Sequence, residues 1–423
     1  MSIVRKRIYY GWWITLAAGA IEFANAGTAI SILTIFVIPM SEEFGWSRTE
    51  ISAAASLGAV LGAGLAPFTG RLVDRAESRL VLVIGGMVVA ISCLFLAITE
   101  TLVGFYVAFA CSRLADQGLI KIGAAPTVGK WFLRYRGRAV ALVFFAGAAG
   151  IIVMAPMVQL VISGWSWRAA WVMLALVMFF IGVVPSAILV RGQPEDLGLN
   201  VDGDPPIAES QHHTSDLPPS ESSPSVVEQQ WLLGEVLRTP TFWLVLFSLF
   251  AVSIGISGVG LHLIPHLTQQ GLGAATAVGT ISVMFTAGAA GALTLGFLSE
   301  RISPRLMLGL VYLLLATSTG ILIVADNIPQ VYLFAVLNGI AGSGVNTLAP
   351  ILWARYYGRA TLGSIYGITR AAQVTGLALG PLLSGIIYDT TGAYYDAFFF
   401  FAVLGLGSSL LILAARTPVR SAG

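Results

Sequence analysis

Long apolar segments, separated by short polar ones, follow one another along the whole chain. A helix needs about 20 predominantly apolar residues to cross the hydrocarbon core of a bilayer. The pattern predicts an all-α membrane protein with twelve transmembrane helices and both termini on one side. The spans lie near residues 12–38, 52–70, 80–99, 102–128, 139–162, 169–190, 241–265, 274–298, 306–325, 330–353, 362–388 and 397–415.

The composition agrees with this pattern. Of the 423 residues, 57% are hydrophobic and only 10% are charged, against roughly 25% charged residues in soluble domains. The lipid bilayer is therefore an expected partner. A net charge of +2 gives no strong field that would attract nucleic acid. Cys93 and Cys111 lie inside apolar runs, so neither a disulfide nor a metal site is predicted.

The basic residues predict the orientation. If both termini are cytoplasmic, 18 of the 23 Lys and Arg fall on the cytoplasmic side, and only Arg48 and Arg168 fall in outer loops. Cytoplasmic loops are enriched in Lys and Arg. The cytoplasmic set includes Arg5, Lys6 and Arg7 at the N-terminus and Arg420 at the C-terminus. We therefore expect cytoplasmic termini.

The longest polar stretch, 192–238, carries nine of the 21 acidic residues and several Pro and Ser residues. This composition predicts a disordered linker. The expected organisation is an N-terminal six-helix bundle (1–190), a cytoplasmic linker (191–238) and a C-terminal six-helix bundle (239–423). His212 and His213 are interpreted as solvated linker residues, with a weak metal site as the alternative.

The two halves repeat short motifs. Ile38-Pro39 recurs as Ile264-Pro265, and the segment 70–75 recurs at the same offset as 296–301. The segment 135–139 recurs as 356–360, at a slightly shorter offset. Related halves predict a pseudo-symmetric transporter that holds its substrate between two bundles that rock.

The segment 70–80 resembles the loop between helices 2 and 3 of the major facilitator superfamily, and 296–306 resembles it again. With twelve spans and a central linker, the resemblance covers the whole chain. It implies the major facilitator fold and a carrier that functions as a monomer. Asp74, Arg75, Glu300 and Arg301 are the expected gating residues, whose charge networks hold the cytoplasmic face shut. The alternative is that these charges only set the topology. Gly70 and Gly296 are expected to allow tight helix packing.

Further motifs are similar to bacterial relatives of monocarboxylate porters and to oxalate/formate antiporters. They are Tyr10-Gly11-Trp12-Trp13, Trp131-Phe132, the segments 134–139 and 191–199, and Gly380-Pro381-Leu382-Leu383. This resemblance implies a small organic acid as substrate and a location in the bacterial inner membrane. One departure is important. Many carboxylate carriers of this group place an arginine on helix 8, whereas 274–298 contains no charged residue.

Five ionisable residues lie within predicted spans: Glu22, Arg113, Asp116, Lys121 and Arg370. Such residues are costly in a membrane and usually functional. Glu22 is the first candidate for proton coupling, and Asp116 is the second. The alternative for Glu22 is a structural carboxylate paired with a neighbouring helix. Asn25, about one turn further on, is expected to bind substrate or to hydrogen-bond to Glu22.

Arg113, Asp116, Gln117 and Lys121 are spaced to form a polar stripe on helix 4. The resemblance implies that helices 1, 4, 7 and 10 line the central cavity. Arg113 is interpreted either as a substrate contact or as the structural partner of Asp116. Lys121 is expected to snorkel toward the cytoplasm, with a place in the cavity as the alternative. Whether His262 faces the cavity is left open.

Arg370, about two turns inside helix 11, has no opposite charge on its own helix. A guanidinium there requires an anion, which is Glu22, Asp116 or a bound carboxylate, and its planar fork suits a carboxylate. Three positive and two negative charges leave +1, which one monocarboxylate would neutralise. If Glu22 is protonated the sum is +2, which would accommodate a dicarboxylate, or a proton together with an anion. Asn338 and Asn346 are candidate substrate ligands, with interhelical hydrogen bonds as the alternative.

The chain has no HExxH, GxSxG, Walker or Cys/His motif, so neither an enzyme nor a cofactor is predicted. Without a nucleotide-binding segment, an ion gradient must drive transport. The predicted function is proton-coupled transport of a small organic anion, a monocarboxylate, by alternating access. The alternatives are efflux of a drug or metabolite, and uptake of a neutral solute.

Overall fold

The computed structural model describes residues 8–75, 78–203, 231–272 and 274–418. The basic residues 5–7 and 420, the two linker histidines and most of the predicted linker lie outside the described residues. Within those ranges the regular structure is entirely helical. The prediction of an all-α fold is confirmed.

Six helical passes form the N-terminal half. They comprise α1 (Tyr10–Asn25), η1 (Ala26–Thr28) and α2 (Ile30–Phe44) as the first pass; α3 (Arg48–Asp74); α4 (Ser78–Ile98); α5 (Leu102–Ala115), η2 (Asp116–Ile120) and α6 (Lys121–Trp131) as the fourth; α7 (Arg136–Gly164); and α8 (Trp167–Val177), η3 (Met178–Val183) and α9 (Val184–Leu189) as the sixth. The π-helical η2 interrupts the fourth pass where its charged residues lie.

Six more passes form the C-terminal half. They are α11 (Pro240–Gln269), α12 (Ala274–Leu298), α13 (Pro304–Val324), α14 (Ile328–Tyr357), α15 (Leu362–Thr391) and α16 (Tyr395–Ala414). The twelve passes coincide with the twelve predicted spans. Ten described helical segments are long and apolar enough to cross a membrane. The second and fourth passes are not among them, and the fourth carries Arg113, Asp116 and Lys121 in its middle.

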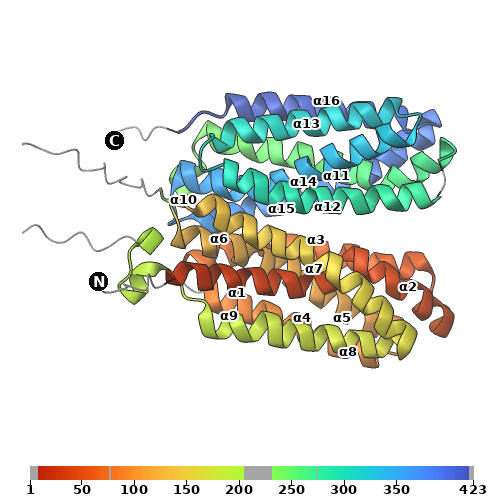
Figure 1. Ribbon diagram of the computed structural model, residues 1–423, viewed down its shortest axis with the longest axis horizontal. Coiled ribbons are helices and arrows are strands. Elements are labelled where there is room, and N and C mark those ends of the chain that lie inside the picture. The colour runs from red at the N-terminus through yellow and green to blue at the C-terminus, as the bar shows by residue number, and fades with distance from the viewer. Residues whose placement is uncertain (1–7, 76–77, 204–230, 273, 419–423) are drawn as a thin grey trace, which may run out of the picture.

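The two halves lie side by side, and the described chain begins and ends at one end of the molecule, here called the terminal side (Figure 1). The opposite end, where α2 ends and α12 begins, is the far side. Between the halves, α3 packs along α15 and α7 packs along α12. One apolar cluster joins Ala66, Ile122, Ala125 and Val140 of the N-terminal half to the core of the C-terminal half. The halves are thus in apolar contact.

Two pairs of glycines bring the halves into backbone contact. A methyl group added at Gly70 would lie 2.2 Å from the carbonyl oxygen of Gly363, and one at Gly137 would lie 2.2 Å from that of Gly296. The same offset along the chain separates Gly70 from Gly296 and Gly137 from Gly363. The expected tight packing at Gly70 and Gly296 is confirmed. The alignment of Gly137 with Gly358 is wrong, because Gly358 ends α14 with a φ of +77°, whereas Gly363 makes the equivalent contact.

The start of the predicted linker is not free of contacts. It forms η4 (Pro194–Leu197) and η5 (Val201–Gly203), and α10 (Leu233–Val236) precedes α11. The carboxylate of Asp202 accepts backbone N–H bonds from Leu133, at 3.1 Å, and from Arg134, at 2.9 Å. These bonds hold the start of the linker against the loop between α6 and α7. The expectation of disorder is therefore wrong for these residues.

A candidate substrate cavity between the halves

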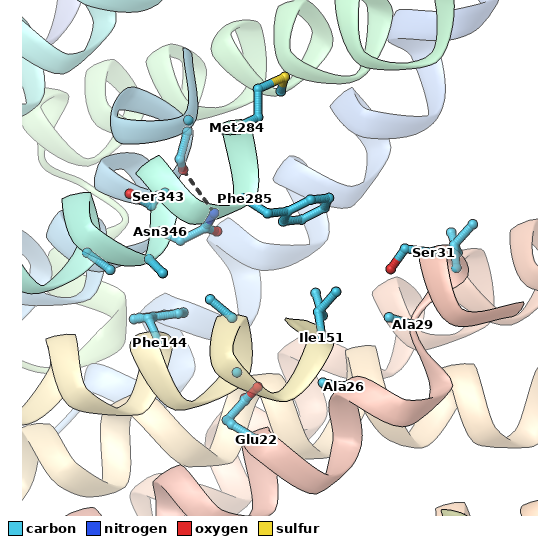
Figure 2. A pocket seen from close by; sticks show the side chains of 18 of the residues that line it. Glu22, Ala26, Ala29, Ser31, Phe144, Ile151, Met284, Phe285, Ser343 and Asn346 are labelled. Atoms are coloured by element: carbon cyan, nitrogen blue, oxygen red, sulfur yellow. Dashed lines mark hydrogen bonds between the residues drawn. The ribbon is translucent and has the colours of Figure 1, made fainter. Parts of the chain in front are cut away.

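A cavity of about 590 Å³ lies between the two halves. Its N-terminal wall comes from the first, fourth and fifth passes, and its C-terminal wall comes from α11, α12 and α14. The first, fourth, seventh and tenth passes line it, as the resemblance implied, and the fifth and eighth passes contribute as well. Figure 2 shows the two walls, with Phe285 pointing from α12 toward Ile151 of α7.

Glu22 and Lys121 form an ion pair in this cavity. The carboxylate of Glu22 comes from α1 and its side chain is only 3% exposed, whereas the side chain of Lys121, from α6, is 28% exposed. Glu22 is therefore bonded to a neighbouring helix. The expectation that Lys121 snorkels toward the terminal side is wrong, because its ammonium group donates a hydrogen bond to Glu22.

Asp116 is the centre of a second buried group. Its carboxylate accepts hydrogen bonds from the guanidinium of Arg113, from Nδ2 of Asn25 at 2.6 Å and from Nε2 of Gln117 at 2.8 Å. Asn25 thus bonds to Asp116 rather than to Glu22. Among the described residues, Oδ1 of Asn25 and Nε of Arg113 are buried without a hydrogen-bond partner. All four side chains line the cavity, and so does Lys121, so the whole stripe predicted on the fourth pass faces it.

Arg370 lies on the terminal side of the cavity rather than in its lining. Its guanidinium donates a 2.9 Å hydrogen bond to Oε1 of Gln117, and its Nε is buried without a partner among the described residues. It lies within electrostatic range of Lys121. Of the expected anions, neither Glu22 nor Asp116 pairs with Arg370 in the described structure, and the bond is to a neutral amide. Of the five intramembrane charges, Arg370 is the one that forms no ion pair in the described structure.

The two candidate asparagines of α14 line the cavity, but each is bonded within its own half. Asn338 donates to Oγ of Ser318 at 3.2 Å, and Asn346 donates to the carbonyl oxygen of Gly342 at 3.2 Å. His262 is not part of the described cavity lining. Its ring bonds to Tyr394 and to the carbonyl oxygen of Pro381.

The predicted gating carboxylates join the halves on the terminal side. Asp74 accepts the backbone N–H groups of Gly363, at 2.6 Å, and of Ser364, at 2.7 Å. Glu300 accepts the backbone N–H of Arg138 at 3.1 Å and forms an ion pair with the side-chain Nε of the same residue at 2.8 Å. Both carboxylates therefore bind the start of a helix in the other half. The first N–H groups of a helix lack intrahelical partners and attract negative charge.

The two arginines that were also expected at the gate behave differently. In the described structure Arg75 and Arg301 are exposed and form no ion pair across the interface. Their expected role in a charge network is not seen in this state. A residue that the sequence did not single out takes part instead, because Arg359 donates to the carbonyl oxygen of Lys130 at 2.8 Å and pairs with Glu195 at 3.1 Å.

The apolar residues of the cavity were also missed. Phe144, Ile151 and Phe285 point into the space between the walls in Figure 2. In the sequence they sit among many apolar residues that face lipid or the cores of the halves, so their residue type carries no distinguishing signal. The lack of charge in α12 was the available hint that this wall is apolar.

Comparisons with known proteins also indicate a transporter. The family model of the Major Facilitator Superfamily matches residues 18–317 and 272–423. Human monocarboxylate transporter 11 is 26% identical, over 98% of this chain and 84% of its own length. The oxalate:formate antiporter of Oxalobacter formigenes is 24% identical, over 85% of this chain and 81% of its own length. The fold is similar to that of the transporter FucP, solved in an outward conformation, with a TM-score of 0.72, 13% identity and coverage of 96% and 99%. The relatives are transporters, in agreement with the prediction that the chain is no enzyme.

Proposed function

The chain belongs to the Major Facilitator Superfamily, and on this premise we propose that it is a secondary active transporter that moves a monocarboxylate together with a proton. Transport proceeds by alternating access of a monomer in the bacterial inner membrane, with both termini in the cytoplasm. The similarity to monocarboxylate transporters and to an oxalate:formate antiporter supports the substrate class. The observation that carries the proposal is the ion pair of Glu22 and Lys121 in the cavity wall, with Arg370 behind that wall and within electrostatic range of Lys121.

The proposed coupling follows from this arrangement. A proton on Glu22 removes the counter-charge of Lys121, whose ammonium group then needs another anion. Arg370 lies within electrostatic range of Lys121 and pairs with no carboxylate in the described structure. Together the two cations would hold one substrate carboxylate, with the guanidinium fork of Arg370 suited to both oxygens. Proton and anion therefore bind favourably together and unfavourably alone, which is the requirement for symport.

The contacts between the halves support a direction of access. The polar contacts of Asp74 and Glu300 close the terminal side, and the cavity extends from Lys121 toward Ser31 and Phe285. With the termini in the cytoplasm, as the basic residues indicate, this state receives substrate from outside. A bound carboxylate would give Lys121 the counter-charge that protonated Glu22 no longer supplies. The proton and the anion together add no net charge to the cavity, so the halves would rock with the same net charge whether loaded or empty.

Replacing Glu22 by glutamine tests the coupling. Glu22→Gln imitates the protonated form, so purified protein in liposomes is expected to exchange labelled organic acid but not to accumulate it in response to a pH gradient. Glu43→Gln is the matched control, because Glu43 pairs with Arg168 at 2.6 Å near the end of α2, away from the cavity. Accumulation by Glu22→Gln with wild-type pH dependence would contradict the proposal and make Asp116 the next candidate.

A further inference from the structure

The C-terminal wall of the cavity offers a substrate little besides apolar surface. The residues that α11 and α12 contribute are uncharged and mostly apolar: Ile256, Gly260, Met284, Phe285, Gly288, Ala289 and Ala292. The polar residues of α14 each use one donor within their own half. Besides the two asparagine bonds described above, Oγ of Ser343 donates to the carbonyl oxygen of Ile340 at 2.9 Å. In the described lining, this wall therefore holds no cation for a second carboxylate.

The volume of the cavity also favours a large ligand with apolar groups. About 590 Å³ is a typical volume for a site that encloses an organic ligand of drug size, since such sites span roughly 300–1,000 Å³. A water molecule occupies about 30 Å³ of liquid, so an acid with about four non-hydrogen atoms would leave most of the cavity to water. The walls around that water-filled part include Phe144, Ile151 and Phe285, which only a larger apolar group would remove from water.

We propose that the substrate is a monocarboxylate with a large apolar body, such as an aromatic or branched-chain acid, rather than a two-carbon acid or a dicarboxylate. This inference rests on the proposed function and specifies its substrate. The carboxylate lies at the inner end, near Lys121 and Arg370, and the apolar body lies between Phe285 and Ile151. A dicarboxylate would place its second charge against the uncharged wall of α12, and a sugar would place its hydroxyl groups there without free partners.

The glycines of this wall provide a direct way to reduce its volume. Apart from its chain neighbours and the backbone of its own helical turn, a methyl group added at Gly342 would meet no atom within 4 Å, and the same holds for Gly407. Gly342 lines the cavity, whereas Gly407 is exposed on α16 and is not part of the described lining. Leucine at position 342 would therefore occupy cavity space without a clash at its Cβ. Gly407→Leu is the matched control.

The experiment measures binding of acetate, hexanoate, 3-phenylpropanoate and oxalate to the purified full-length protein by calorimetry and thermal shift at pH 5.5. We expect affinity to rise with the apolar body, by up to about fourfold per buried methylene, and oxalate to bind no better than acetate. Gly342→Leu should weaken 3-phenylpropanoate at least tenfold and leave acetate unchanged. Phe285→Ala should weaken 3-phenylpropanoate roughly tenfold, and Gly407→Leu should bind like wild type.

The outcomes separate the two proposals. Equal affinities for acetate and 3-phenylpropanoate, or tighter binding of oxalate, would overturn the apolar-body inference and leave a carboxylate transporter standing. An equal loss of acetate and 3-phenylpropanoate binding in Gly342→Leu would overturn it as well. If none of the four acids binds to a protein that unfolds cooperatively, both the inference and the proposed function fail.

Discussion

The two halves of the molecule have related folds, but they line the cavity with residues of different chemistry. The N-terminal half carries two ion pairs, the partly buried Glu22–Lys121 and the buried Arg113–Asp116, whereas the C-terminal half carries Arg370 and an uncharged apolar wall. On the terminal side the halves are instead alike, because Asp74 and Glu300, at equivalent positions of the repeat, each bind the start of a helix in the other half.

This difference separates two requirements of a carrier. The gate, formed by Asp74 and Glu300 with their partners, joins the halves through a pseudo-symmetric interface, so each half contributes the same kind of contact. The cavity has no such requirement, since a substrate with one charged end and one apolar end needs two unlike walls. We therefore expect substitutions at the gate to have similar effects in the two halves, and substitutions in the cavity to have unlike effects.

The largest effect on stability is expected in the N-terminal wall. Asp116→Ala removes the shared acceptor of Arg113, Asn25 and Gln117 and leaves the guanidinium buried without its counter-charge. Breaking a buried ion pair in this way costs about 3–5 kcal/mol. The free energy of unfolding in detergent checks this value. The double variant Arg113→Ala with Asp116→Ala should recover much of the stability lost in Asp116→Ala. A double variant no more stable than Asp116→Ala would contradict the account.

Arg370→Ala should lower substrate affinity more than it lowers stability. Losing one partner of a desolvated charge pair costs about 2–5 kcal/mol, or roughly 30-fold to several thousand-fold in affinity. Arg370→Lys should lose less, because a point charge replaces the planar fork. Binding of 3-phenylpropanoate and the melting temperature are the measurements.

Gln117→Ala is the control for Arg370, because it removes the amide to which the guanidinium is bonded but keeps the charge. If it loses as much affinity as Arg370→Ala, then the bond between the two side chains, rather than a direct contact with substrate, explains the effect. Wild-type affinity in a stable Arg370→Ala protein would exclude Arg370 as a substrate contact.

The gate is expected to respond equally to changes in either half. Asp74→Ala and Glu300→Ala each remove two polar contacts with the other half. A hydrogen bond to a charged group contributes about 1.5–3 kcal/mol. In each variant the ratio of molecules open to closed on the terminal side should therefore rise roughly tenfold or more. Spin labels at the exposed positions 71 and 360 report the distance between the halves. Arg75→Ala should leave that distance unchanged, and opening in only one of the two carboxylate variants would contradict the symmetry.

The smallest effect is expected in the C-terminal wall. Asn338→Ala removes a neutral hydrogen bond to Ser318, which contributes about 0.5–1.5 kcal/mol. Its effect on carboxylate affinity should be small, because the proposed carboxylate lies near Lys121 and Arg370 rather than against this wall. A loss of affinity as large as that of Arg370→Ala would show that the C-terminal wall binds the charged end of the substrate, and would break the comparison of the two walls.

The sequence determines much of this fold because its signals are local. Span length predicted twelve passes, and the repeated motif at Asp74 and Glu300 predicted two carboxylates that the structure places between the halves. Spacing on one helix also predicted the stripe from Arg113 to Lys121. Partners from different helices were harder to predict. Asn25 bonds to Asp116 rather than Glu22, and Arg370 bonds to Gln117, because these contacts depend on how passes distant in sequence are rotated and on the π-helical turn at Asp116.

The central claim is that one proton on Glu22 accompanies one carboxylate bound near Lys121 and Arg370. Proton uptake by the purified protein during binding of 3-phenylpropanoate, followed with a pH indicator in weakly buffered solution, measures it most directly. We expect wild type to take up close to one proton per bound anion at neutral pH, and Glu22→Gln to bind the anion with no uptake. Equal uptake by the two proteins, or binding to wild type without uptake, would contradict the claim.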